Sequence, residues 1–194
     1  MKRKLIVLLS LFLAPASMHA ATTVYSNAMS GPAENPANAS PGTGFFTITV
    51  DNTLNTLRVQ ATFSGLTGTT SAAHIHASAS MVPLTGTAGV AVVPPSLPGF
   101  PLGVTAGTYD NTFDMTLSSS FNASYVTANG GTVPAAWSAL QTQIDQGRSY
   151  LNFHTSAFGG GEIRGILVPV PEPGSAVFLG LSAAGLAVSR RRKA

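Results

Sequence analysis

The chain has 194 residues and no cysteine, so it is long enough for one domain whose core is not cross-linked by disulfides. Its formal charge of +3 comes from the two ends, because between residues 21 and 169 three arginines stand against six carboxylates, a net charge of −3. A folded part without a basic surface cannot neutralise a phosphate backbone, which excludes ordinary nucleic-acid binding.

The first twenty residues have the three parts of a secretory signal. The basic start Lys2-Arg3-Lys4 precedes an apolar run at residues 5–13, and small residues near Ala20 offer a cleavage site. We therefore expect residues 1–20 to be a signal peptide and the rest of the chain to be exported. The alternative interpretation is a buried N-terminal helix.

Two alternating segments predict a β-hairpin early in the folded part. Residues 31–44 have no clear period and indicate an irregular entry segment. Apolar residues then occur at every second position in residues 46–50 and 57–63, as in half-buried strands. Residues 51–55 between them carry Asp and Asn, whose side chains favour turns.

The rest of the folded part predicts short strands, one long loop and one helix. We expect strands at residues 72–77, 90–93, 113–117, 150–154 and 162–168, and a surface loop at 96–107. A helix at 134–146 would begin at Pro134, bury Trp137 and Leu140, and stop at Gly147. Residues 21–168 are thus predicted to be mainly β, an antiparallel β-sandwich or barrel with one short helix.

Residues 169–194 have the composition of a membrane-targeting tail. The block Val170-Pro171-Glu172-Pro173 precedes an uncharged, mostly apolar stretch at 174–188, and a basic cluster closes it. The stretch is shorter than the roughly 20 residues of an ordinary membrane span. Basic residues on the cytoplasmic side would leave the domain outside.

This tail resembles a PEP-CTERM sorting signal. The resemblance is carried by Pro171, Glu172 and Pro173, a short hydrophobic helix, and the arginines Arg190, Arg191 and Arg192. It implies an exosortase-type sorting enzyme as partner, transient anchoring in the inner membrane of a Gram-negative bacterium, and removal or transfer of the tail near residues 171–173. An ordinary C-terminal transmembrane helix is the alternative, and it also places the domain outside.

Three histidines are the candidate site of the folded part. His74 and His76 are two apart on a predicted strand and so point to the same face, while His154 lies on another. If the strands are neighbours, three imidazoles converge in a set typical of zinc or copper sites. Glu162 and Asn152 are candidates for a fourth ligand or for a hydrogen-bond partner of the ligands.

Plainer interpretations of these residues remain open. Histidines on strands are often only hydrogen-bonded, and Glu162 with Arg164 would form an ion pair on one strand face. No nucleophile elbow, phosphate-binding loop or His-Glu-x-x-His helix is present, so no catalytic residue is assigned.

Four ordered blocks resemble a CHRD domain, and together they span roughly residues 25–167. They are Gly31-Pro32-Ala33-Glu34-Asn35-Pro36, Gly65-Leu66 with Ala73-His74-Ile75-His76, Gly147-Arg148-Ser149-Tyr150-Leu151-Asn152-Phe153-His154-Thr155, and Gly161-Glu162-Ile163-Arg164-Gly165. The resemblance implies a β-rich extracellular module, and it includes the three histidines and the Glu-Ile-Arg-Gly segment among the family's characteristic residues.

The sequence therefore favours an exported cell-surface or extracellular-matrix module, without enzymatic activity, that holds zinc or copper through the histidines. One alternative is a zinc- or copper-dependent metalloenzyme that uses the same site. Another is an extracellular polysaccharide-binding protein, which would need exposed aromatic side chains on a flat face. The candidates for that role are Trp137, Tyr109, Tyr125 and a few phenylalanines.

Overall fold

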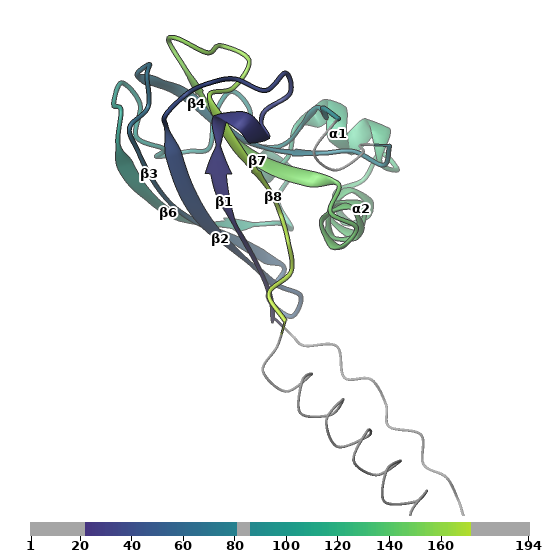
Figure 1. Ribbon diagram of the computed structural model, residues 1–194. Helices are drawn as coiled ribbons and strands as arrows, with labels where there is room; N and C mark the ends of the chain where they lie inside the picture. Colours follow the sequence, from purple (N-terminus) through teal and green to yellow (C-terminus); the bar gives the residue numbers. More distant parts are fainter. Residues whose placement is uncertain (1–21, 81–85, 172–194) are drawn as a thin grey trace, which may run out of the picture.

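The computed structural model describes residues 22–80 and 86–171 (Figure 1). The predicted signal peptide lies outside the described residues, and so do Glu172, Pro173, the stretch at 174–188 and the three terminal arginines. Among the described residues, no helix has the length and apolar character needed to cross a membrane.

The described chain forms eight strands, two α-helices and two short 3-10 helices. In order these are β1 (Thr22–Ser30), η1 (Gly31–Ala33), β2 (Thr43–Asp51), β3 (Thr56–Ser64), β4 (Thr70–Ala77), β5 (Val90–Val92), β6 (Gly107–Asp114), η2 (Ser118–Ser120), α1 (Ala123–Ala128), α2 (Val133–Asp145), β7 (Ser149–Thr155) and β8 (Ile163–Ile166).

All eight strands belong to one antiparallel sheet in the order β5-β4-β7-β8-β1-β2-β3-β6. The sheet curls into a half-barrel, and the helices lie on the side of β7 and β4 (Figure 1). The predicted antiparallel, mainly β class is confirmed, with a single curled sheet as its architecture. The predicted hairpin is β2–β3, in which Ile48 pairs with Val59.

The concave side of the sheet holds one hydrophobic core. Its largest side chains include Phe46, Ile48, Leu57, Ile75, Leu151 and Phe153. The predicted surface loop at 96–107 differs from expectation, because Leu97 and Phe100 are buried. The Phe100 ring lies 5.5 Å from Phe63 on β3 and 4.7 Å from Phe153 on β7. This loop therefore packs against strands from both halves of the curled sheet.

Helix α2 follows its sequence signals closely. The Thr132 side chain accepts a hydrogen bond from the Ala135 backbone N–H and caps the first turn. Gly147 has a positive φ of 66°, as expected of a residue that follows a helix end. The predicted apolar face is buried against the core, and its members are Ala136, Trp137, Leu140 and Ile144.

Candidate metal centre

Strands β4 and β7 bring the three histidines together on the face of the sheet opposite the core. The alternate residues of β4 are buried in the core, and these are Ala73, Ile75 and Ala77. His74 and His76 therefore point the other way. His154 pairs with Ala72 and so lies diagonally across from His74. One ring nitrogen from each histidine lies within 4.8 Å of one from each of the others.

One ring nitrogen of each histidine forms a hydrogen bond with a backbone carbonyl. The contacts are His74 Nε2 with Pro95 O at 2.5 Å, His76 Nδ1 with Ala88 O at 2.8 Å, and His154 Nδ1 with Gly159 O at 3.0 Å. A carbonyl oxygen only accepts hydrogen bonds, so each of these nitrogens carries the ring proton. In a neutral ring the other nitrogen then holds a lone pair, which fixes the tautomer of all three side chains.

The remaining nitrogens face one another rather than donors. His74 Nδ1 lies 2.9 Å from His154 Nε2, so two lone pairs meet at hydrogen-bond distance unless a cation lies between them. His76 Nε2 is buried and has no hydrogen-bond partner among the described residues. The arrangement offers three acceptors and no donor at its centre.

Burial disfavours the obvious cation, a proton on one of the rings. Desolvation lowers the pKa of His76 to about 4, against weaker opposing effects from the Ala88 carbonyl and the Asn152 side chain. Desolvation also lowers the pKa of His74 and of His154, and the nearby His154 lowers the pKa of His74 further. The cluster is therefore neutral at ordinary pH, the state in which imidazoles bind metals.

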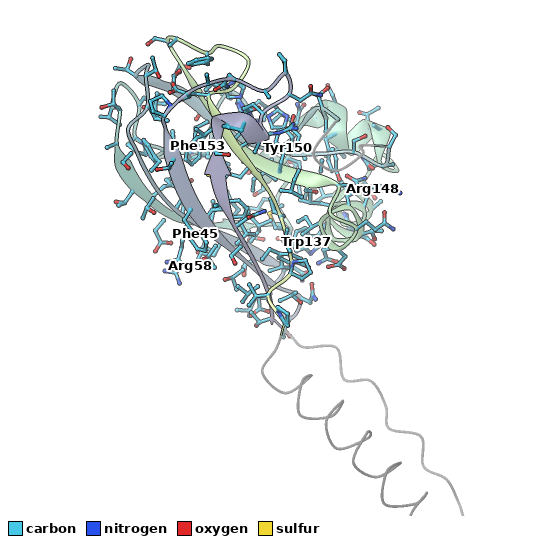
Figure 2. All side chains as sticks on the ribbon, viewed as in Figure 1. Phe45, Arg58, Trp137, Arg148, Tyr150 and Phe153 are labelled. Atoms are coloured by element: carbon cyan, nitrogen blue, oxygen red, sulfur yellow. The ribbon has the colours of Figure 1, made fainter. Side chains whose placement is uncertain are left out.

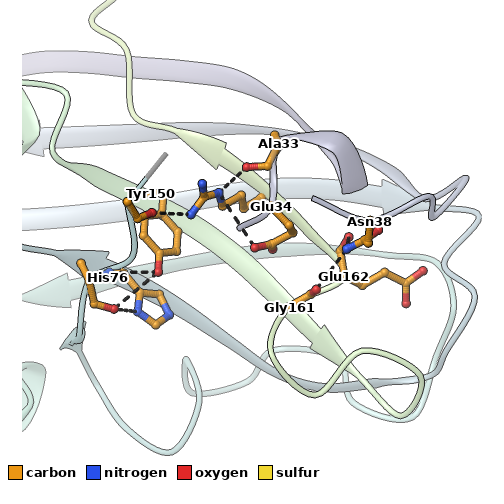
Figure 3. Close-up of polar contacts among 10 residues, drawn as sticks. Ala33, Glu34, Asn38, His76, Tyr150, Gly161 and Glu162 are labelled. Carbon is orange, nitrogen blue, oxygen red and sulfur yellow. Dashed lines mark hydrogen bonds and ion pairs between the residues drawn. The ribbon is translucent and has the colours of Figure 1, made fainter. Parts of the chain in front are cut away.

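A stack of side chains holds His76 in place beneath the cluster (Figure 3). The His76 ring lies parallel to that of Tyr150, at 4.6 Å and 7°. The Arg164 guanidinium lies 4.7 Å from the centre of the same tyrosine ring, a cation–π contact. Arg164 in turn donates to the carbonyls of Ala33 and Gly86 and lies 3.9 Å from the Glu34 carboxylate.

Asn152 connects this stack to the loop before β8. It pairs across the sheet with His74 on one side and with Arg164 on the other. Its Oδ1 and the Glu34 Oε1 are buried and have no hydrogen-bond partner in the part of the chain that the structure describes. Gly161, at a φ of 131°, lies against both residues, and a Cβ there would fall 2.6 Å from Glu34 Oε1 and 2.7 Å from Asn152 Nδ2. Only glycine fits this position without moving one of them.

Glu34 is the most perturbed carboxylate near the site. Burial raises its pKa to about 7, although Arg164, the Asn35 backbone and Asn152 act in the opposite direction. No sequence pattern assigned Glu34 or Tyr150 to the site. Both residues lie in the blocks that resemble the CHRD domain, which was the one available signal.

Glu162 belongs to a different cluster. Its carboxylate accepts hydrogen bonds from Ser40 Oγ at 2.5 Å, Thr155 Oγ1 at 2.6 Å, the Gly68 N–H at 3.1 Å and the Thr67 N–H. These contacts do not support the predicted role of Glu162 as a ligand or partner of the histidines. Arg164 forms an ion pair with Glu34, whereas the plainer interpretation expected a pair with Glu162.

Two family models match the chain. The CHRD domain model matches residues 25–167, and the PEP-CTERM protein-sorting motif matches residues 169–193. No curated protein and no solved structure shows significant similarity to the chain. The sorting motif indicates export through the exosortase pathway of Gram-negative bacteria. The family match runs from Tyr25 in β1 to Leu167 after β8 and includes the three histidines, so the chain belongs to the CHRD-domain family and carries a PEP-CTERM sorting motif.

Proposed function

We propose that this chain is an exported cell-surface or extracellular-matrix module that binds one zinc or copper ion through His74, His76 and His154. One observation carries the proposal. All three imidazoles donate their N–H groups to backbone carbonyls, so the remaining ring nitrogens, at the centre of the cluster, are acceptors. A metal ion is the ligand that such a set of lone pairs suits.

The dimensions of the cluster support this assignment. Nitrogens that bind zinc at 2.0–2.1 Å in a tetrahedron lie about 3.4 Å from one another. The separations here run from 2.9 Å to at most 4.8 Å, so small side-chain rotations would complete the site. The three carbonyls also supply the hydrogen bonds that ligating histidines usually make with their second nitrogen.

Metal analysis of the mature domain tests the proposal. The fragment should run from residue 21 to residue 171, carry no polyhistidine tag, and be dialysed against zinc or copper before mass spectrometry. We expect about one ion per chain, lost in His74→Ala, His76→Ala and His154→Ala. Gln60→Ala is the matched control, because it removes a polar group from the opposite part of the sheet. No stoichiometric metal in the wild-type domain would overturn the proposal.

A metalloenzyme remains an alternative that shares this site. Three protein ligands leave one position for water or another small molecule, as in catalytic zinc sites. The described residues near the cluster include no carboxylate that hydrogen-bonds to a histidine. Hydrolase and redox assays on the metal-loaded domain distinguish a metalloenzyme from a non-enzymatic module. Activity in the wild-type domain that is lost in His154→Ala would favour the enzyme.

Polysaccharide binding has one specific observation in its favour. The three aromatics suggested by the sequence, Trp137, Tyr109 and Tyr125, are each buried to 6% exposure, whereas Phe45 on β2 is 51% exposed. Phe45, which is labelled in Figure 2, borders a shallow groove of about 380 Å³ with Gln60, Thr62, Thr108 and Asp110. The Arg58 guanidinium bonds to Asp110 at 2.6 and 2.8 Å and holds that carboxylate in place.

Titration calorimetry with the polysaccharide of a PEP-CTERM-bearing host tests this second candidate. Binding that weakens at least about tenfold in Phe45→Ala, and not in Leu102→Ala, would support it. Leu102 is the control because it is 54% exposed and lies outside the groove. Equal binding by both variants would argue against a carbohydrate role for this face.

A further inference from the structure

The segment after β8 does not leave the sheet where the sorting motif begins. The Ser26 N–H donates to Val168 O at 2.9 Å, and the Val170 N–H donates to Val24 O at 2.8 Å. Tyr25 and Pro169 form the bridge between these two bonds. The chain is thus paired with β1 up to Val170, although the motif match starts at residue 169.

This pairing puts the predicted processing point against the folded domain. The Pro-Glu-Pro sequence begins at Pro171, directly after Val170, the last residue that bonds to β1. A membrane enzyme that acts at residues 171–173 must therefore approach the end of the sheet from which the tail emerges. Figure 1 shows that the start of β1 and the end of the described chain meet there, beside the β2–β3 turn.

The same end of the domain carries most of its exposed large apolar side chains. Of the six in the described residues, four lie here, namely Leu54, Leu117, Val168 and Val170. Leu54 is in the turn next to the start of β1, because Asp51 pairs with Thr22. Leu117 follows β6, whose last residue pairs with Thr56 beside that turn. We call these four residues the exit face.

We propose that the exit face is a docking surface for the exosortase-type sorting enzyme, which then recognises the folded domain together with the Pro-Glu-Pro sequence. Clustered exposed apolar residues mark interaction sites. A protein fits this surface better than an anionic lipid headgroup does, because Asp51, Asp114 and Asp145 lie at the same end. The inference concerns sorting, and it is independent of whether the histidines hold a metal.

Processing of the full chain in a host that contains the sorting enzyme tests the proposal. We expect Leu54→Asp and Leu117→Asp to lower the ratio of processed to unprocessed chain about tenfold, the loss expected of residues central to an interface. Leu102→Asp is the control. Leu102 is exposed in the loop before β6, whereas Leu117 follows the other end of that strand. Processing of both exit-face variants at the wild-type level would overturn the proposal.

Two further measurements distinguish the proposal from its rivals. A Gly/Ser insertion of about six residues after Val168 leaves the motif at residues 169–193 intact but moves it away from Leu54 and Leu117, so processing should fall. Faster processing would instead show that release from β1 is limiting and would overturn the proposal. The chain has no cysteine, so Leu54→Cys provides a unique cross-linking site. We expect an adduct with a tagged sorting enzyme from Leu54→Cys and not from Leu102→Cys, and adducts with lipid alone would overturn a protein partner.

Discussion

Two polar clusters meet on β7, where His154 belongs to one and Thr155 to the other, and they differ in one respect. Glu162 presents its carboxylate to four donors, two hydroxyls and two backbone N–H groups, and each oxygen has at least two of these contacts. The histidine cluster presents three lone pairs to one another and to no donor. The first cluster is complete within the chain, whereas the second lacks a positively charged partner.

This difference distinguishes a structural site from a candidate binding site. A buried group whose hydrogen bonds are all made stabilises the segments that supply its partners, here residues 40, 67–68 and 155. A buried acceptor without a donor costs free energy, and the proposed metal ion would remove that cost. Both clusters lie in the sequence blocks of the CHRD family, so membership of a block does not by itself reveal which role a residue has.

The largest effect that the comparison predicts is that of Glu162→Gln. The variant replaces one carboxylate oxygen, which accepts two hydrogen bonds, with an NH2 group that cannot accept any. At least two hydrogen bonds to a charged group are therefore lost. We expect the free energy of unfolding to fall by about 3–5 kcal/mol, measured by urea denaturation. Asp110→Asn, in an exposed ion pair, is the control and should change stability least. An unchanged urea midpoint in Glu162→Gln would mean that the hydrogen bonds of the Glu162 cluster do not stabilise the fold.

Metal should stabilise the histidine cluster and leave the Glu162 cluster unaffected. At a free metal concentration of a hundred times the Kd, the wild-type domain should gain about 2.7 kcal/mol. His154→Ala should gain nothing, while Glu162→Gln should keep the full gain on its lower baseline. Thermal melts with and without zinc or copper provide the measurement. Equal gains in wild type and His154→Ala would place the metal elsewhere.

Gly161→Ala probes the contact between the two clusters. A methyl group at this backbone angle would be strained and would displace Glu34 and Asn152, so we expect a loss of about 2 kcal/mol and weaker metal binding. The matched control is Gly160→Ala, because a Cβ there meets nothing within 4 Å. If both variants bind metal as the wild type does, Asn152 has no role in positioning the site.

The smallest predicted effect is a pair of opposite pH dependences. Burial raises the pKa of Glu34 to about 7, above its ordinary value of 4.5, so its contribution to stability is full below pH 4.5 and is lost as the pH rises towards 7. Relative to Glu34→Gln, the wild type should lose about 1–2 kcal/mol over that range.

Glu162 should behave in the opposite way. Burial acts to raise its pKa, but hydrogen bonds from Ser40, Thr155, Thr67 and Gly68 outweigh burial and lower it. Its contribution is therefore full above pH 4.5 and is lost as the pH falls through the lowered pKa. Urea midpoints of wild type, Glu34→Gln and Glu162→Gln from pH 3 to 8 test both signs. Parallel pH profiles for the two variants would contradict the assignment.

Much of the fold followed from local patterns. Alternation predicted β2, β3 and β4, and the proline and glycine signals bounded α2 to within a residue or two. Strand β1 was not predicted, because its buried Tyr25 and Met29 are four residues apart with the polar Asn27 between them. Asn27 donates to Ile166 O at 3.0 Å, a contact with a strand nearly 140 positions later that no local pattern contains.

The sequence by itself determined the sorting motif, the antiparallel β class and the choice of the three histidines, and it predicts the signal peptide. These depend on composition, on short motifs and on period-two alternation, all of which are local properties of the chain. Only the tertiary structure decided that Glu162 accepts hydrogen bonds from residues 40, 67–68 and 155, and that Glu34 and Tyr150 lie close to the histidines. It also decided that the sorting motif starts in a segment paired with β1. Each of these depends on which strands are neighbours, and pairing between distant strands is decided by the packing of the whole core.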